Sequence, residues 1–373
     1  MHEVSRRRFL TELGAGVAGC SLCGACGAAP VQAGARRKEA LFYERLADKS
    51  VRCTLCPRRC VVPAGGRGYC GVRQNNGGRY DTLVYGWPCA MNLDPIEKKP
   101  FFHVYPGSRA FSIATVGCNI ECKFCQNWDI SQAEPDDVNP RLRYVGPDRI
   151  AALAAERKAR TIAYTYNEPT VFYEYMADCA RAARQRGLEN VIVSNGFIAD
   201  APQKALFPEV RAIKIDLKAF TQKFYGEICD GFLQPVLDTL KRLADAGCWY
   251  EIVVLLIPTL NDGVDEIKRM TAWIVKELGP DVPVHFSRYS PRYKIRNIPP
   301  TPISTLRRAR GIAREQGCHF VYLGNVPGDE GQHTYCPSCG EIAIKRYGYI
   351  ILQNNIADGR CAACKTPIAG VWD

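Results

Sequence analysis

Residues 115–131 read TVGCNIECKFCQNWDIS, and this stretch decides both the fold class and the expected chemistry. It overlaps the apolar run AFSIATV, which is typical of a buried strand. Cys118, Cys122 and Cys125 follow that run at C-x3-C-x2-C spacing. Three thiolates on one short loop can hold three corners of a 4Fe–4S cluster, which normally takes four cysteine ligands. The fourth iron would stay open to a substrate or cofactor, as in catalytic metal sites. A zinc knuckle that borrows a ligand from elsewhere is the alternative.

Further along the chain, apolar strands alternate with helical stretches. The helical stretches include residues 169–187, 232–247 and 264–279, and the last two end in glycine, the usual helix stop. Several strands are continuous apolar runs, as expected for a parallel sheet covered on both faces. The expected strands are AFSIATV, RTIAYTY, NVIVSN, RAIKIDL, YEIVVLLIP, VPVHFSRY and FVYLGN.

Polar residues stand where four of these strands end: GC after the first, NEP after the second, SNG after the third and DLK after the fourth. In a parallel barrel the chemistry gathers at the carboxyl ends of the strands. A doubly wound sheet would concentrate its site at one crevice instead. The pattern therefore predicts an α/β fold with a barrel, specifically a partial (β/α)6-type TIM barrel.

The segment CNIECKFC resembles the cysteine motif of the radical S-adenosylmethionine (SAM) superfamily, with Phe124 at its aromatic position. The resemblance implies that SAM chelates the open iron through its amino and carboxylate groups. The reduced cluster would pass one electron to the sulfonium, giving methionine and a 5′-deoxyadenosyl radical that abstracts hydrogen. A barrel would have to hold the sulfonium beside the cluster and exclude water.

The same resemblance assigns roles at the other strand ends. Asn167 and Glu168 lie where the superfamily carries a Gly-Gly-Glu-type motif and would hold the SAM amino group; the preceding Gly position is Tyr166 here. Ser194 and Asn195 offer polar contacts to ribose or carboxylate. For each of these residues, a structural salt bridge or a turn-forming role is the alternative.

The stretch KIDLKAF resembles the Asp-x-Lys element of glycyl-radical-enzyme activases. It places Asp216 and Lys218 on one face of a strand. By this likeness Lys218 would meet the SAM carboxylate, and a structural ion pair is again the alternative.

Two further cysteine sets flank the middle block. Cys336, Cys339, Cys361 and Cys364 form C-x2-C pairs that predict a zinc-ribbon-like tail with a closed structural zinc site, an iron–sulfur cluster being the rival. A tail this short needs metal for much of its folding energy. Near the N-terminus, four more cysteines suit either zinc, which is slightly favoured, or a second, electron-relaying cluster: Cys53, Cys56, Cys60 and Cys70.

Five further segments indicate a particular group within this superfamily: RCTLCPRRC, GYCGVR, DPIEKKPFFHVYPGS, VYLGNVPG and GRCAAC. These segments are similar to those of the radical SAM enzymes of the AmmeMemoRadiSam system, which are described as pyruvate-formate-lyase-activase-like. The likeness covers residues 40–373. It specifies the chemistry and leaves the substrate open.

Composition agrees with a globular protein of 373 residues that carries 19 cysteines and a net charge of +11. Residues 1–38 contain Ser5, Arg6 and Arg7 followed by Phe9 and Leu10, a twin-arginine-type signal pattern. Cys20, Cys23 and Cys26 are interpreted as part of this leader. It suggests export or membrane attachment, whereas SAM chemistry suggests the cytoplasm. No other apolar run reaches the ~18 residues of a transmembrane helix.

We therefore expect a leader over 1–38, a Cys-rich domain over 40–104, the core barrel over 105–330 and the tail over 331–373. The expected function is reductive cleavage of SAM and hydrogen abstraction from an unidentified substrate, with glycyl-radical-enzyme activation as one version. The alternatives are RNA modification, which the positive charge and zinc ribbon would tolerate, a non-catalytic iron–sulfur electron carrier and a zinc-stapled binding module. The expected partners are a low-potential electron donor of the flavodoxin or ferredoxin type and a protein substrate.

Overall fold

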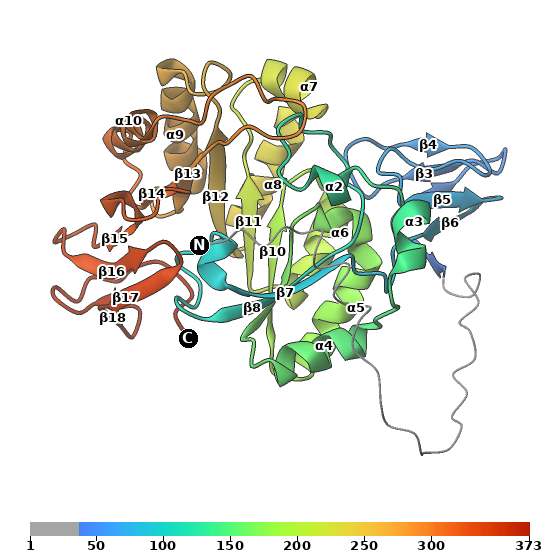
Figure 1. The fold of residues 1–373 in the computed structure, drawn as a ribbon, viewed down its shortest axis with the longest axis horizontal. Helices are drawn as coiled ribbons and strands as arrows, with labels where there is room; N and C mark the ends of the chain where they lie inside the picture. The colour runs from blue at the N-terminus through green and yellow to red at the C-terminus, as the bar shows by residue number, and fades with distance from the viewer. Residues whose placement is uncertain (1–36) are drawn as a thin grey trace, which may run out of the picture. The chain divides into compact units, whose positions relative to one another are not determined.

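The centre of the protein is an eight-stranded sheet (Figure 1). This computed structural model describes residues 37–373. Seven strands run parallel, and each lies beside the next one along the chain. They are β8 (Arg109–Ala114), β9 (Thr161–Tyr164), β10 (Glu189–Ser194), β11 (Ala212–Asp216), β12 (Trp249–Leu256), β13 (Val284–Arg288) and β14 (Val321–Gly324). Each of the seven coincides with one of the apolar runs that the sequence predicts as strands, although β8, β10 and β12 begin one residue earlier, so this part of the prediction is confirmed.

The order of the strands decides between the two predicted architectures. A doubly wound sheet reverses its strand order at a switch point, whereas this order follows the chain from β8 to β14. The sheet is open, since its edges are β14 and the antiparallel strand β7 (Ala90–Pro95), which pairs with β8. The predicted α/β class with a mostly parallel sheet is confirmed. A closed barrel is not formed, and the partial-barrel shape stays a prediction.

Helices connect and cover the parallel strands (Figure 1). In α8 the buried residues Val236, Leu240 and Leu243 recur at helical spacing and face the core. Gly247 and Gly279 take positive φ after α8 and α9, as the predicted helix stops require. The helices are α4 (Pro147–Glu156), α5 (Tyr173–Arg184), α6 (Asp200–Leu206), α7 (Gln222–Cys229), α8 (Leu233–Asp245), α9 (Val264–Leu278) and α10 (Ile303–Glu315), with the short α2 (Trp128–Ser131) and α3 (Pro135–Val138) and the 3-10 turns η2 (Ile96–Lys98), η3 (Asn139–Arg141), η4 (Pro169–Phe172), η5 (Phe207–Glu209) and η6 (Glu330–Gln332).

Two small sheets precede the central one, and two follow it (Figure 1). The first pair consists of β1 (Lys38–Glu39), β6 (Arg79–Thr82) and β5 (Arg73–Asn76), and of β2 (Tyr43–Arg45), β3 (Val51–Cys53) and β4 (Val61–Val62). The second pair consists of β15 (Thr334–Tyr335), β16 (Ile342–Tyr347) and β17 (Ile350–Asn354), and of β18 (Ile356–Ala357) and β19 (Arg360–Cys361).

Buried cations join these small sheets to the core. The Arg73 guanidinium donates to both carboxylate oxygens of Glu174 on α5, each at 2.7 Å. Arg346 on β16 donates to the carbonyl oxygen of Phe102 at 2.7 Å. Both arginines are almost fully buried. Removing one partner of such a pair leaves an uncompensated polar group, so each contact fixes where its sheet docks.

Residues 1–36 of the predicted leader, with its arginine pattern and Cys20, Cys23 and Cys26, lie outside the described residues, whereas Lys38 is already part of β1. None of the helices within 37–373 is both long and apolar enough to cross a membrane.

Candidate functional site

The loop that carries Cys118, Cys122 and Cys125 runs from β8 to α2 and is held by the end of α7. The backbone N–H of Glu121 donates to the carbonyl oxygen of Cys229 at 2.8 Å, and that of Lys123 donates to Ile228 at 2.9 Å. The last carbonyls of a helix have no partner within the helix. Here they fix the cysteine loop across the carboxyl edge of the sheet.

The three thiols of this loop are not gathered closely enough to surround one metal ion. Cys122 is buried, and Cys118 and Cys125 are half-buried. Within residues 37–373, a group of three or more ligand atoms within 4.8 Å of one another occurs only in the C-terminal tail. One metal ion needs such closeness, whereas a cubane binds each thiolate to a different iron and so keeps the sulfurs farther apart.

Burial keeps these thiols protonated in the metal-free protein. It raises the pKa of the Cys118 thiol and the Cys125 thiol above the ordinary value. The pKa of Cys122 is raised first by the thiol of Cys229, which lies against it, and then by burial. Because metals bind thiolates, loading the site must release protons.

Asn167 presents an unused acceptor beside this loop. Its Nδ2 donates to the carbonyl oxygen of Gly117 at 2.8 Å. Its Oδ1 is buried and has no hydrogen-bond partner among the described residues. A buried acceptor left unpaired costs about 1–3 kcal/mol. The site therefore favours a ligand that brings an N–H donor to this position.

Tyr166 precedes Asn167 in a backbone conformation that glycine adopts more readily. Its φ is 73°, in the left-handed region. The Tyr166 hydroxyl donates to Asp94, and the Lys99 ammonium lies 4.1 Å from the ring centroid. These contacts hold a conformation that costs of order 1–3 kcal/mol. The chain thus keeps a glycine-like backbone at the position where the related motif has glycine.

Glu168 joins the ends of β9 and β10. Its carboxylate accepts hydrogen bonds from Thr170 N at 3.0 Å and Thr170 Oγ1 at 2.6 Å, from Ser194 Oγ at 2.8 Å and from Asn195 N at 2.7 Å. Burial raises its pKa, and the hydrogen bonds oppose that shift. Four donors fill the capacity of a carboxylate. The geometry therefore favours the structural alternative, in which Glu168 positions the strand ends, over the expected grip on an amino group.

Ser194 and Asn195 are also used within the protein. The Ser194 hydroxyl, already bonded to Glu168, accepts from Gly196 N at 3.0 Å. Asn195 Nδ2 donates to Asn119 Oδ1 at 2.9 Å and lies 3.9 Å from the sulfur of Cys118. Asn195 therefore ties the end of β10 to the cysteine loop and places an N–H near one of its sulfurs.

Asp216 and Lys218 form an ion pair with Lys214 at the end of β11. Lys218 Nζ lies 2.8 Å from Asp216 Oδ2, and Lys214 contacts the other oxygen. Although burial opposes ionisation, the two ammonium groups lower the pKa of Asp216 to about 2. Burial likewise opposes the charge of Lys218, but Asp216 and the nearby Cys122 thiol raise the pKa of Lys218 above its ordinary value. Two cations and one anion leave positive charge beside the cysteine loop, which suits a carboxylate ligand.

The sequence model of the Radical SAM superfamily matches residues 112–273, a range that includes the cysteine loop and all four polar strand ends. A protein of Methanocaldococcus jannaschii, the uncharacterised protein MJ0808, is 44% identical over 329 residues, which are 88% of this chain and 97% of that protein. The chain belongs to the radical SAM superfamily. It is also 21% identical to the pyruvate formate-lyase 1-activating enzyme of Escherichia coli K12 over 233 residues, covering 58% of this chain and 93% of that enzyme.

Two solved structures match parts of this chain. A domain of the pyruvate-formate lyase-activating enzyme from Bacteroides vulgatus matches 44% of this radical SAM chain and 98% of its own, with a TM-score of 0.39 and 18% identity. Streptococcus suis SuiB bound to S-adenosylmethionine matches 62% of this chain and 53% of its own, with a TM-score of 0.46 and 12% identity.

Membership of the radical SAM superfamily implies a 4Fe–4S cluster and SAM, and the residues present fit both. The three thiols of the loop supply the soft sulfur donors that iron–sulfur clusters require. The unpaired Oδ1 of Asn167 suits an ammonium donor, and the ammonium of Lys218 suits a carboxylate. These are the two charged groups of an amino-acid moiety such as the one in SAM.

A segment after β13 covers the cysteine loop from outside. The indole of Trp128 stacks on the ring of Tyr293 with centroids 5.3 Å apart. The backbone N–H groups of Lys294 and Ile295 donate to the carbonyl oxygen of Lys123 at 2.9 and 3.1 Å. The aromatic side chain of the motif, Phe124, is buried and packs toward α7, so it supports the loop from within.

The C-terminal cysteines form a group that could hold one metal ion. The sulfurs of Cys336 and Cys364 lie 3.5 Å apart, and those of Cys339 and Cys361 lie 3.8 Å apart. Four thiolates around a tetrahedral zinc with bonds of about 2.3 Å would lie about 3.8 Å apart. Hydrogen bonds with Thr366 lower the pKa of Cys364 to about 6, which favours its thiolate. Zinc itself stays a prediction.

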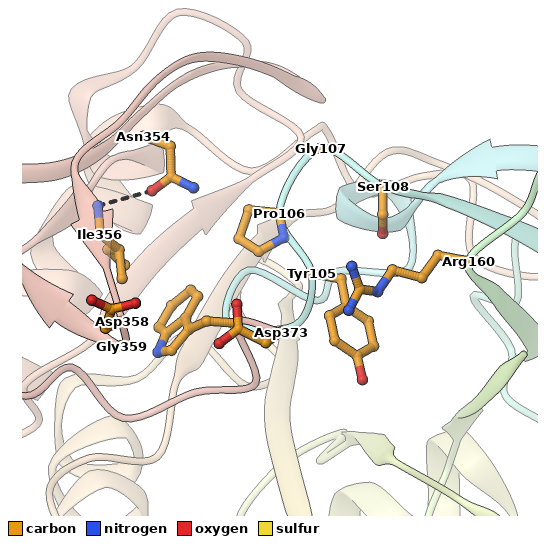
Figure 2. A pocket seen from close by; sticks show the side chains of 11 residues that line it. Tyr105, Pro106, Gly107, Ser108, Arg160, Asn354, Ile356, Asp358, Gly359 and Asp373 are labelled. Carbon is orange, nitrogen blue, oxygen red and sulfur yellow. Dashed lines mark hydrogen bonds between the residues drawn. The ribbon is translucent and has the colours of Figure 1, made fainter. Parts of the chain in front are cut away.

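A cavity of about 410 Å³ lies at the amino ends of the parallel strands (Figure 2). It is lined by Tyr105 and Arg160, which precede β8 and β9, and by tail residues that include Asp358 and Trp372. The Arg160 guanidinium lies 3.9 Å from the ring centroid of Tyr105. This cavity is at the amino ends of the strands, away from the cysteine loop, and is not part of the candidate site.

Sequence reasoning missed one neighbour of the site. Cys229 belongs to none of the cysteine sets that the sequence singles out, and it is fully buried. However, its thiol lies against Cys122, because α7 ends at the cysteine loop. No spacing rule links residues 122 and 229, so only the fold could place them together.

Proposed function

We propose that this protein cleaves SAM reductively at a 4Fe–4S cluster bound by Cys118, Cys122 and Cys125, and that the product radical abstracts hydrogen from a separate substrate. The observation that supports this most is the three-cysteine loop with an unpaired acceptor, Asn167 Oδ1, and a cation, Lys218, beside it. When bound, the reduced cluster supplies one electron to the sulfonium of SAM, which releases methionine and a 5′-deoxyadenosyl radical.

The chain's own residues orient SAM and protect the reaction. Asn167 Oδ1 accepts from the amino group, and Lys218 pairs with the carboxylate. Glu168 and Asn195 hold the strand ends and the cysteine loop in one arrangement. The Trp128–Tyr293 stack follows the cysteine loop, and in this proposal it limits the access of water, which matters because so reactive a radical attacks whatever lies near it.

We further propose that the substrate is a protein and that the enzyme acts as a glycyl-radical-enzyme activase. The Asp216–Lys218 element and the similarity to the pyruvate formate-lyase 1-activating enzyme of E. coli, which covers 93% of that enzyme, support this version. A low-potential flavodoxin or ferredoxin would supply the electron. We also propose that the enzyme belongs to the AmmeMemoRadiSam system and that the cysteines of the tail bind zinc.

The test is anaerobic purification, then incubation with SAM and dithionite, with 5′-deoxyadenosine measured by mass spectrometry. We expect 5′-deoxyadenosine from the wild type and none from Cys122→Ala. Cys229→Ala is the matched control: it should keep the cluster and the cleavage, since its thiol is not one of the three ligands. A bound cluster without cleavage would support the electron-carrier alternative, and zinc alone would support the binding module.

A further inference from the structure

The four N-terminal cysteines lie around a single cavity. Cys53 ends β3, Cys56 and Cys60 lie on the turn before β4, and Cys70 lies on the loop before β5. The turn is tight, since Cys53 N donates to the carbonyl oxygen of Cys60 at 2.9 Å and Arg59 N to that of Cys56 at 3.2 Å. All four cysteines line the same cavity, so the turn and the loop bring four thiols to face one space.

The four sulfurs around this cavity are not gathered as they are around one zinc ion. Thiolates that bind zinc contact the ion at about 2.3 Å and therefore lie about 3.8 Å from one another. No three of these four sulfurs approach within 4.8 Å of one another, whereas in the same structure the four tail sulfurs do. The two cysteine sets therefore differ in the size of the group that they can surround.

Two buried donors face the cavity without partners. Arg73 and Tyr80 both line it, and their buried Nε and Oη atoms have no hydrogen-bond partner among the described residues. Glu174 offsets the charge of Arg73, so Arg73 contributes here mainly as a donor. A Cβ on Gly68 would lie 2.5 Å from Tyr80 Oη, so the glycine leaves room for the hydroxyl. Sulfide and thiolate sulfurs of a cluster would accept from both donors.

The cavity also adjoins the loop of the SAM site. A Cβ on Gly117 would lie 2.8 Å from the carbonyl oxygen of Cys70, so the two backbones are in contact one residue before Cys118. Asn119 lines the cavity, and its Oδ1 accepts from Asn195 Nδ2, which lies near the sulfur of Cys118. A group bound in the cavity would thus have a short, packed path to the cysteine loop.

We propose that Cys53, Cys56, Cys60 and Cys70 bind a second 4Fe–4S cluster, which relays electrons to the SAM site. It takes one electron from a low-potential donor protein and is reduced. It then passes that electron to the cluster at Cys118, Cys122 and Cys125 and returns to its oxidised state, so each SAM cleaved consumes one donor electron. The relay rests on the proposed function, whereas the metal assignment does not.

The metal assignment is tested on the full chain, reconstituted anaerobically with iron and sulfide and analysed for iron, sulfide and zinc. The wild type should hold about eight irons per chain. The Cys118→Ala/Cys122→Ala/Cys125→Ala variant should keep about four, in a cluster whose electron paramagnetic resonance (EPR) signal does not respond to SAM. Cys318→Ala, a buried cysteine outside every set, is the control and should keep the full content. A triple variant without iron, whether it holds a second zinc beside the one proposed for the tail or no metal beyond the tail, would overturn the assignment.

The relay is tested with Cys56→Ala/Cys70→Ala. This variant should lose about four irons, keep SAM cleavage with dithionite and lose it with a reduced flavodoxin. Unchanged cleavage with flavodoxin would overturn the relay.

Tyr80→Phe tests the site without removing a ligand. This variant should keep the iron content and lower the reduction potential of the second cluster, because a hydrogen bond to sulfur is lost. An unchanged potential would contradict the cavity geometry. If the wild type fails to cleave SAM while the triple variant keeps its irons, the proposed function fails and the second cluster stands.

Discussion

Asn167 is the residue that most directly indicates a ligand with an amino group, because its Oδ1 is buried and unpaired among the described residues. Replacing it with alanine removes the Oδ1 acceptor, and hydrogen bonds to charged groups contribute about 1.5–3 kcal/mol. We therefore expect Asn167→Ala to raise the Kd for SAM by at least about tenfold while the iron content stays unchanged. Equilibrium dialysis with labelled SAM measures this. Asn76→Ala, exposed on β5, is the matched control, and equal affinity in both variants would contradict the assigned role.

A substitution of Glu168 can show whether this residue stabilises the fold or binds the cofactor. Glu168→Gln places an amide NH2 against donors that now face a carboxylate. We expect the free energy of unfolding to fall by about 1–3 kcal/mol, since buried donors lose their acceptor. Chemical denaturation of the metal-loaded protein measures it. If stability is unchanged and only SAM affinity falls, Glu168 holds the cofactor after all.

The sequence predicts the types of the site residues better than their roles. Cysteine spacing indicates a cluster loop because ligand geometry is local to the loop. It does not tell which hydrogen bonds Glu168, Ser194 and Asn195 make, because these join strand ends that are distant in the chain. The left-handed backbone of Tyr166 could not be predicted either, since Tyr166 owes it to contacts with Asp94 and Lys99.

At the scale of elements, the C-terminal tail should depend on its metal. Its strands are short, and its cysteine sulfurs are already gathered. Cys364→Ser should remove about one zinc per chain and lower the temperature at which the tail unfolds, because metal supplies folding energy. Zinc analysis and thermal unfolding measure this, with the half-buried Cys248→Ser as control. Loss of iron in place of zinc would support the rival cluster.

The strands could be predicted where both faces are buried, and less well elsewhere. The seven parallel strands are continuous apolar runs, as the packing of helices over a parallel sheet requires. By contrast, β7 reads AMNLDP and ends in proline, so its place at the edge of the same sheet is not visible in the sequence. It falls within the range expected for the Cys-rich domain, so that block contributes a strand to the core.

At the scale of the whole molecule, His103 links the segment before β8 to the tail. Its Nδ1 donates to the carbonyl oxygen of Ala369 at 2.6 Å, and its Nε2 accepts from Tyr322. Burial lowers the pKa of His103 to about 4, and the nearby charges are Glu251, His285 and Arg346. The imidazole of residue 103 therefore becomes protonated below about pH 6.5 in the unfolded chain, but only below about pH 4 in the folded protein. The neutral histidine thus contributes fully to the free energy of unfolding above pH 6.5, and this contribution is lost as the pH falls from 6.5 to about 4.

We expect this loss to reach about 3 kcal/mol near pH 4. Urea denaturation of the wild type and of His103→Gln at several pH values measures it. Both proteins carry the tail cysteines, so acid release of metal affects both and the difference isolates the histidine. His319→Gln, an exposed histidine, should behave as the wild type. Parallel pH curves for the wild type and His103→Gln would contradict the prediction.

The central claim is that the cluster at Cys118, Cys122 and Cys125 keeps one iron free for SAM. The most direct measurement is electron–nuclear double resonance on the reduced Cys56→Ala/Cys70→Ala protein with SAM labelled with ¹⁵N in its amino group. The account predicts a ¹⁵N coupling to the cluster that is absent without SAM and persists in Cys229→Ala. A reduced cluster that binds no labelled nitrogen, or one that Cys229→Ala destroys, would show that the fourth iron is not open and would contradict it.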